Sequence, residues 1–222
     1  MARQNKLYKS INRIYVYFDM LINDHGLVRM LYANRYRVSS KVFRSGHPNP
    51  IDVARAGRRG IKTIVNLRGG HDSSANRLSS KACRKHGIEH IDFHARSSKP
   101  PSKEMIHAAN ELFERIEYPA LLHCKSGADR SGLMSTLYLI LHEGQRSVDA
   151  RKQLHWRYGH FRFSRTGILD HFFDSYEKDC QDEPMVFLTW VDEKYDPDAL
   201  QASFQGRSKL AYKFVDMILR RE

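Results

Sequence analysis

The chain has 222 residues, of which 41% are hydrophobic and 28% are charged, and this balance predicts one soluble domain with extensions. Its three cysteines, Cys83, Cys124 and Cys180, exclude a disulfide framework and favour a reducing cytoplasm. The net charge of +12 is uneven, because residues 1–60 hold 12 Lys and Arg against 3 Asp and Glu. A surplus of that size favours an anionic partner.

The basic N-terminal end predicts an amphipathic helix over residues 7–22. Apolar residues recur there at helical spacing, while Lys6, Lys9 and Arg13 share another face. Two interpretations stay open: the helix lies on an anionic membrane surface, or it packs on the rest of the protein. Its apolar stretch is too short for a membrane span and is interrupted by Asp19, so we expect membrane association to be peripheral.

The middle of the chain alternates strand and helix patterns. β-Branched and apolar runs predict strands, and Ile61–Leu67 is the clearest because it ends in Arg68-Gly-Gly. This alternation predicts an α/β fold with a central, largely parallel sheet of four to five strands flanked by helices. The predicted strands are 41–46, 61–67, 88–93 and 119–124, and the predicted helices are 50–56, 74–86, 101–116, 130–142, 148–158, 168–179 and 207–221.

Cys124 is the predicted nucleophile. The strand at 119–124 delivers it to a loop that directly precedes a helix. A free thiol has a pKa near about 8.5, and its thiolate is the form that attacks well. The N–H groups and the dipole of the following helix stabilise negative charge, so they are expected to lower that pKa.

The loop after Cys124 has the composition of a phosphate site. Gly127 lets the loop curl so that its N–H groups point inward, and Arg130 supplies a planar fork for two phosphate oxygens. Ser131 is expected to donate a hydrogen bond to the sulfur. These residues predict in-line attack on phosphorus through a phosphocysteine intermediate, with the phosphate held by Lys125, Ser126, Gly127, Ala128, Arg130 and Ser131.

Residues 123–132, HCKSGADRSG, resemble the signature of the cysteine-dependent protein tyrosine phosphatase superfamily: His-Cys, five residues, then Arg-Ser/Thr-Gly. The segments 43–48 and 60–68 resemble the small dual-specificity-type phosphatases of bacteria, fungi and plants. The resemblance implies a catalytic domain at 36–180, which leaves 1–35 as a helix with its connector and 181–222 as a helical extension. It also implies a metal-independent hydrolase without a cofactor, and the sequence contains no CxxC or HExxH pattern.

The superfamily further implies a general acid, usually an aspartate some thirty to forty residues before the cysteine. Asp92 has that spacing but falls inside the predicted strand 88–93. Asp129 is the second candidate, because its place before Arg130 resembles the myotubularin and Sac-type phosphoinositide phosphatases. Asp129 alternatively holds the loop by accepting backbone N–H bonds, and His94 or no side-chain acid is the third alternative.

Other residues near the loop have two interpretations each. Arg44 and Arg68 lie near predicted strand ends, so they either bind a second anionic group of the substrate or form surface ion pairs. His123 is expected to hydrogen-bond the loop backbone. Lys125 resembles the lysine of the tensin-type phosphoinositide phosphatases, whose second lysine is replaced here by Ala128.

These observations favour a phosphatase for a lipid, glycolipid or inositol phosphate, cytoplasmic and peripheral at a membrane surface. One alternative is a protein tyrosine or serine/threonine phosphatase. Another is a phosphate-binding module without turnover, although a binding module needs no thiolate. Nucleic acid is not favoured, because the Tyr and Arg residues at 32–37 accompany no recognition motif.

Overall fold

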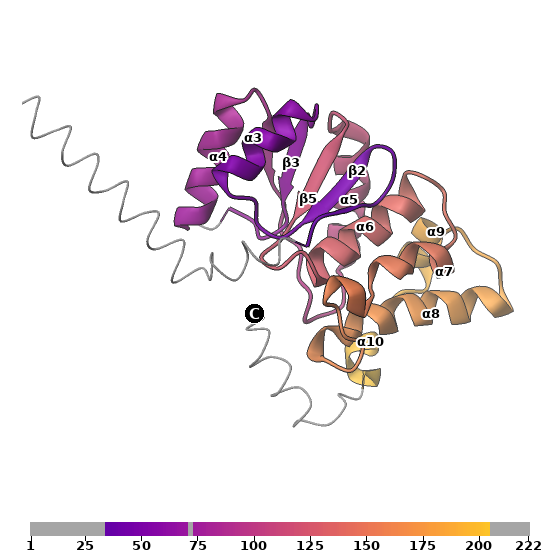
Figure 1. Cartoon of the computed structure of the whole chain (residues 1–222). Helices are drawn as coiled ribbons and strands as arrows, with labels where there is room; N and C mark the ends of the chain where they lie inside the picture. Colours follow the sequence, from indigo (N-terminus) through magenta and orange to yellow (C-terminus); the bar gives the residue numbers. More distant parts are fainter. Residues whose placement is uncertain (1–33, 71–72, 205–222) are drawn as a thin grey trace, which may run out of the picture.

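The computed structural model describes residues 34–70 and 73–204 (Figure 1). The helices predicted at 7–22 and 207–221 lie outside the described residues. No helix in the described part of the chain combines the length and the apolar character that crossing a membrane requires.

One sheet of five strands forms the centre of the fold, in the order β1-β2-β5-β3-β4. β1 is antiparallel to β2, whereas β2, β5, β3 and β4 pair in parallel. This arrangement confirms the predicted α/β fold with a largely parallel sheet. The strands are β1 (Tyr36–Arg37), β2 (Val42–Ser45), β3 (Thr63–Asn66), β4 (Glu89–Asp92) and β5 (Ala120–His123).

Helices cover both faces of this sheet. Figure 1 shows α3 (Pro50–Arg58) and α4 (Ser74–Lys85) on one face, with α5 (Lys103–Arg115) and α6 (Asp129–Leu141) on the other. Because side chains alternate along a strand, the two faces form separate cores. Leu122 lies in the larger core on the α5 and α6 side, whereas its neighbour Leu121 packs against the smaller core on the α3 and α4 side.

The predicted helix at 148–158 is wrong in its extent. α7 covers only Ser147–Ala150, and 3-10 turns follow at Arg151–Gln153 and Trp156–Tyr158. Between these turns Leu154 leaves the helical conformation, at φ −95° and ψ 85°. The Gln153 carbonyl accepts a hydrogen bond from Arg44 Nη1 at 2.6 Å. The Gln153 carbonyl is therefore bonded to a side chain from β2 and not to a further turn of the helix. The spacing of apolar residues cannot indicate such a contact.

Three more helices complete the described chain: α8 (Ile168–Asp182), α9 (Phe187–Glu193) and α10 (Pro197–Ser203). Trp190 of α9 is 1% exposed and belongs to the same core as Leu122. The predicted domain boundary at residue 180 falls inside α8, and the larger core continues beyond it. The boundaries at 35 and 180 stay a prediction.

Candidate active site

Cys124 lies at the carboxyl end of the central strand. β5 is flanked by β2 and β3, and His123 pairs with Ser45 on one side and with Asn66 on the other. This edge of a parallel sheet is where α/β folds bind ligands. The segment of residues 124–130, called the phosphate loop below, leads from Cys124 into the first turn of α6.

Four consecutive carbonyl groups of the phosphate loop are hydrogen-bonded from outside it. The Lys125 carbonyl accepts from the His47 N–H at 3.2 Å, and the Ser126 carbonyl accepts from Asn34 Nδ2 at 3.0 Å. Arg44 Nη2 donates to the carbonyls of residues 127 and 128, at 2.8 and 2.7 Å. In a trans peptide the C=O and N–H groups point in opposite directions. The N–H groups of residues 126–129 therefore point into the loop, as an anion site requires.

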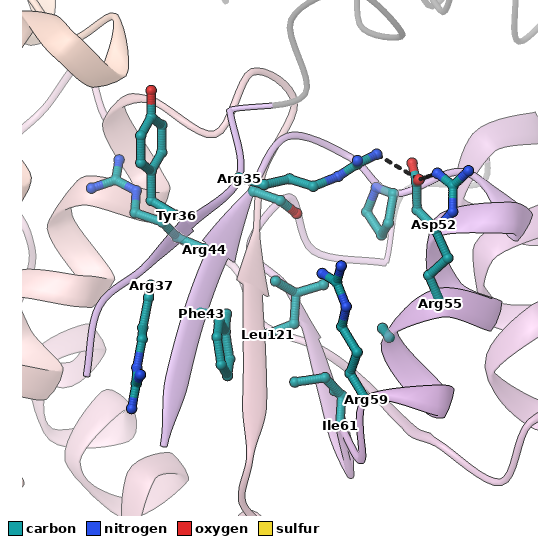
Figure 2. Close-up of a pocket in the computed structure, with 13 residues that line it drawn as sticks. Arg35, Tyr36, Arg37, Phe43, Arg44, Asp52, Arg55, Arg59, Ile61 and Leu121 are labelled. Carbon is teal, nitrogen blue, oxygen red and sulfur yellow. Dashed lines mark hydrogen bonds and ion pairs between the residues drawn. The ribbon is translucent and has the colours of Figure 1, made fainter. Parts of the chain in front are cut away.

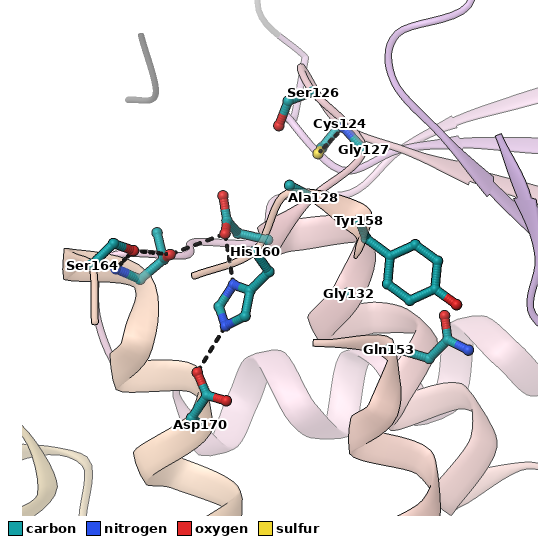
Figure 3. A network of polar contacts seen from close by, with 12 residues as sticks. Cys124, Ser126, Gly127, Ala128, Gly132, Gln153, Tyr158, His160, Ser164 and Asp170 are labelled. Atoms are coloured by element: carbon teal, nitrogen blue, oxygen red, sulfur yellow. Dashed lines mark hydrogen bonds and ion pairs between the residues drawn. The ribbon is translucent and has the colours of Figure 1, made fainter. Parts of the chain in front are cut away.

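Position 127 requires glycine because the loop leaves no space for a Cβ atom there. Its φ is +76°, and its N–H donates to Cys124 Sγ at 3.2 Å (Figure 3). A Cβ at this position would lie 2.5 Å from the Gly46 backbone nitrogen. The glycine thus permits both the turn and the close approach of the chain after β2.

The thiol of Cys124 is buried, with the residue 2% exposed. Burial by itself raises the pKa of this thiol, but the Arg130 guanidinium and hydrogen bonds from Ser131 outweigh it. The net effect lowers the pKa from its ordinary value. The site therefore favours the thiolate, which is the nucleophilic form.

Arg44 does not have the substrate-binding role considered for it. Its side chain is fully buried and bonded to backbone carbonyls of the phosphate loop and of Gln153. Its guanidinium also stacks on the Tyr158 ring, 4.3 Å from the centroid. Arg44 is thus a support behind the loop and is not open to a substrate.

Arg68 and His123 form part of the layer beneath the loop. Arg68 is 9% exposed, and its Nη1 lies 3.4 Å from His47 Nδ1, so it is not an open anchor for a substrate either. The His123 ring packs edge-on against His47, and His123 Nδ1 lies 3.4 Å from the Cys124 carbonyl oxygen. Burial, and then the charge of His47, hold the pKa of His123 well below its usual range. A neutral His123 ring that donates to this carbonyl agrees with the prediction that His123 hydrogen-bonds the loop backbone.

A buried network of polar side chains holds the first turn of α6 (Figure 3). Asp129 Oδ1 accepts from His160 Nδ1 at 2.7 Å and from Thr166 Oγ1 at 3.0 Å. His160 Nε2 lies 2.8 Å from Asp170 Oδ2. Burial lowers the pKa of His160, but hydrogen bonds and charges from the two carboxylates outweigh it and raise this pKa to about 9. The imidazole is therefore protonated at neutral pH, and both nitrogens donate.

This network does not support Asp129 as the general acid. Its carboxylate is paired with a protonated imidazole, and the residue is only 5% exposed. An ionised, buried carboxylate has no proton to give to a leaving group, so Asp129 is an anchor for the loop. Sequence reasoning missed His160, since no motif or spacing connects it to Cys124. Asn34, which bonds the loop although it lies 92 residues before Ser126, was missed for the same reason.

Asp92 ends a strand that does not adjoin the strand of Cys124 in the sheet. It ends β4, and β3 separates that strand from β5. Its side chain is exposed, and Oδ1 accepts from Asn66 Nδ2 at 2.7 Å. Asp92 is absent from the pocket that opens beside Arg130. The role of Asp92 as the general acid stays a prediction.

The pocket beside Arg130 has a volume of about 290 Å³ and is formed by the segment between β4 and α5. Its described lining contains three cationic side chains, Arg96, Lys99 and Arg130, and no carboxylate. His94 is a further titratable group there. Lys125 is half-buried on the phosphate loop. Arg96 and Lys99 were not predicted as site residues, although both lie in the loop that follows a strand ending at the ligand-binding edge of the sheet.

Within residues 34–70 and 73–204, no three His, Cys, Asp or Glu side chains are grouped so that they could hold a metal ion.

A parallel sheet that delivers a cysteine to an N–H-lined loop closed by arginine defines the class of cysteine-dependent protein tyrosine phosphatases. The family model PTP-NADK, described as DSP-PTPase phosphatase fused to NAD+ kinase, matches residues 35–165. The chain belongs to this family, which is of the dual-specificity type.

Two known proteins illustrate the similarity. Dual specificity protein phosphatase TpbA of Pseudomonas aeruginosa strain UCBPP-PA14 is 32% identical over 113 residues, which cover 50% of this chain and 48% of TpbA. The chain spans about half the length of the curated relatives it matches. The crystal structure of Tk-PTP in the active form is 18% identical with a TM-score of 0.50, covering 68% of this chain and 97% of that one. At this identity the similarity concerns the fold alone.

Proposed function

We propose that this protein is a phosphomonoester hydrolase that works through a phosphocysteine at Cys124. The observation that carries the proposal is the set of inward N–H groups at residues 126–129 around a cysteine whose thiol pKa is lowered. An anion site in front of a thiolate holds a phosphoryl group in position for in-line attack.

The reaction has two steps. The Cys124 thiolate attacks phosphorus, so that a P–S bond forms and the P–O bond to the leaving group breaks. The loop N–H groups and Arg130 stabilise charge on the equatorial oxygens. Water then attacks phosphorus and the P–S bond breaks, which releases inorganic phosphate and restores the thiolate. Ser131, whose hydrogen bond lowers the pKa of Cys124, stabilises the departing sulfur.

His94 is the proton donor that the geometry favours among the three candidates. It lines the pocket beside Arg130, whereas Asp92 does not and Asp129 is buried in the His160 network. The His94→Gln variant should therefore lose more activity on a phenyl or alkyl phosphate than on p-nitrophenyl phosphate, whose leaving group needs little protonation. Asp92→Asn is the matched control. A leaving-group-dependent loss in Asp92→Asn alone would contradict this assignment.

The substrate class that we favour is a phosphomonoester with further negative charge near the scissile phosphate, such as an inositol, lipid or glycolipid phosphate. The cations Arg96 and Lys99 beside Arg130, together with Lys125 on the loop, support this choice. A location in the cytoplasm, peripheral at an anionic membrane, follows from the same substrate class and from the basic N-terminal sequence.

A second candidate function is dephosphorylation of protein tyrosine or serine/threonine residues. It is favoured by the similarity to TpbA, which is named as a dual specificity protein phosphatase.

Phosphate release without added metal tests both candidates. Wild-type protein and Cys124→Ser should be compared on phosphopeptides, phosphoinositides and lipid-linked sugar phosphates. Cys124-dependent release that is fastest on the lipid and inositol phosphates is expected. Faster release from phosphopeptides would favour the second candidate. No release from any substrate would leave a phosphate-binding module, and release by Cys124→Ser at the wild-type rate would contradict the mechanism.

A further inference from the structure

A second pocket, here called the arginine pocket, lies on the α3 side of the sheet (Figure 2). Its volume is about 450 Å³, within the range of small-molecule sites. It lies between β1, β2 and α3, at the edge of the smaller core. None of the residues discussed for the phosphate chemistry uses this space, apart from Arg44, whose guanidinium is bound to the phosphate loop.

The floor of the arginine pocket is apolar. Phe43 of β2 and Leu121 of β5 point to this face of the sheet and are only half-buried, and Ile61 lies beside them. These side chains are the part of the smaller core that α3 leaves partly uncovered. An apolar group that covered them would remove this surface from water, which is favourable.

The rim is strongly basic. Arg35, Arg37, Arg55 and Arg59 are exposed, and the lining contains one carboxylate, that of Asp52. Asp52 lies 2.5 Å from Arg35 Nη2 and 3.4 Å from Arg55 Nη1. Figure 2 shows the Arg59 side chain extending along the pocket beside Ile61 and Leu121, and no carboxylate among the described residues pairs with it. Planar guanidinium groups in excess over carboxylates suit the oxygens of an anionic head group.

We infer that the arginine pocket binds an anionic amphiphile, whose head group contacts Arg59 and its neighbours and whose apolar chain covers Phe43 and Leu121. Charge argues against the preceding part of the same chain as the occupant, because residues 1–33 carry 5 Lys and Arg against 2 Asp and would add positive charge to a basic rim. A ligand that brings negative charge neutralises the rim while it covers the floor.

The pocket is connected to the phosphate loop through β2. Ser45 lines the pocket, and its carbonyl oxygen lies 3.4 Å from Ser131 Oγ. The next residue, Gly46, is in contact with Gly127. A bound amphiphile therefore lies one strand away from the loop without entering it.

Calorimetric titration of the full chain as Cys124→Ser tests this inference independently of the proposed hydrolysis, because that variant cannot turn over. The probes are dodecanoate and dodecanoyl lysophosphatidic acid, each below its micelle concentration, so that a carboxylate and a phosphate head group are compared on one chain length. Glycerol 3-phosphate supplies the head group without the chain. Excess inorganic phosphate fills the phosphate loop throughout.

Saturable binding of at least one chain-bearing probe is expected, and Arg59→Gln should weaken it at least about tenfold. Arg58→Gln is the matched control, because Arg58 is exposed on the same helix but does not line the pocket. Arg55→Gln replaces the test variant if Arg59→Gln does not fold. Equal affinities in the test and control variants, no binding of either probe, or equally tight binding of glycerol 3-phosphate would overturn the inference. If only one of the two amphiphiles binds, its head group identifies the source of the ligand.

Discussion

At the scale of single residues, two buried cations fix the geometry of the phosphate loop. Arg44 reaches it from β2 and bonds its carbonyls, while His160 reaches Asp129 from the segment after α7. A buried charge is costly unless it is paired or hydrogen-bonded, so these contacts are expected to be specific in geometry. The rigidity of the loop therefore depends on residues that do not touch the phosphate.

The first prediction concerns the thiol of Cys124. Because Arg130 lowers its pKa, the rate of alkylation by iodoacetamide should rise with pH around a midpoint below about 8.5 in the wild type. Arg130→Met should move that midpoint to higher pH and reduce kcat/KM about a hundredfold or more, whereas Cys124→Ser should abolish turnover. An unchanged midpoint in Arg130→Met would show that another group activates the thiol.

The second prediction concerns His160. Its pKa of about 9 in the folded protein exceeds the ordinary 6.5, so the folded state retains a proton that the unfolded state releases. This contribution to stability is complete below about pH 6.5 and is lost as the pH rises through about 9. Between pH 7 and 8 the free energy of unfolding should fall by roughly 1 kcal/mol per pH unit.

Urea unfolding at several pH values measures this effect, and a Cys124→Ser background removes the titration of the active-site thiol. His160→Gln in that background should flatten the pH dependence and lower stability at pH 7. The same slope in both proteins would mean that His160 is not protonated in the folded state.

At the scale of elements, β2 serves two sites at once. Arg44 supports the phosphate loop on one side of the sheet, while Phe43 forms the floor of the arginine pocket on the other. The alternation of side chains along a strand explains this division. The phosphate loop itself depends on the positive φ angle of Gly127.

The third prediction compares two glycines with similar backbone angles. Gly127 has φ +76° and no room for a Cβ, whereas Gly144 has φ +64° and nothing within 4 Å of that position. Gly144→Ala should cost only the backbone term of about 1–2 kcal/mol. Gly127→Ala should cost more and should also remove activity, because the loop must shift away from Gly46. Thermal unfolding and phosphate release measure the two effects. Equal losses of stability in both variants would show that the missing space at Gly127 is not the cause.

At the scale of the whole molecule, the basic residues and the larger hydrophobic core lie in different parts of the chain. Basic residues concentrate toward the N-terminal side, and four of them form the rim of the arginine pocket. The larger core instead continues from the sheet to α9 and Leu200 of α10. In the described part of the chain, the larger core thus joins Cys124 to α9 and α10, whereas arginines between residues 35 and 59 form the basic rim of the arginine pocket.

The fourth prediction concerns that surface. Full-length protein should sediment with vesicles that contain anionic lipid and not with neutral vesicles, and the bound fraction should fall as salt increases. Deleting residues 1–24 should reduce sedimentation while phosphate release from a water-soluble substrate is retained. Undiminished sedimentation of the shortened protein would favour packing of the predicted N-terminal helix on the rest of the protein over membrane contact.

The α/β alternation, the strand before Cys124 and the loop that runs to Arg130 could all be predicted from the amino-acid sequence. These features are local: apolar periodicity, a glycine where the chain must curl, and a cysteine directly before a helix. The predicted helix at 148–158 failed because the hydrogen bond from Arg44 to Gln153 involves residues far apart in the chain.

The remaining roles follow from tertiary contacts, since each depends on which segments are neighbours in space. β3 lies between the strand that ends at Asp92 and the strand that leads to Cys124. Arg44 is buried and supports the phosphate loop, and His160 pairs with Asp129 across 31 residues of chain. No spacing rule contains this information, because the free energy of a buried charge depends on the groups that surround it in space.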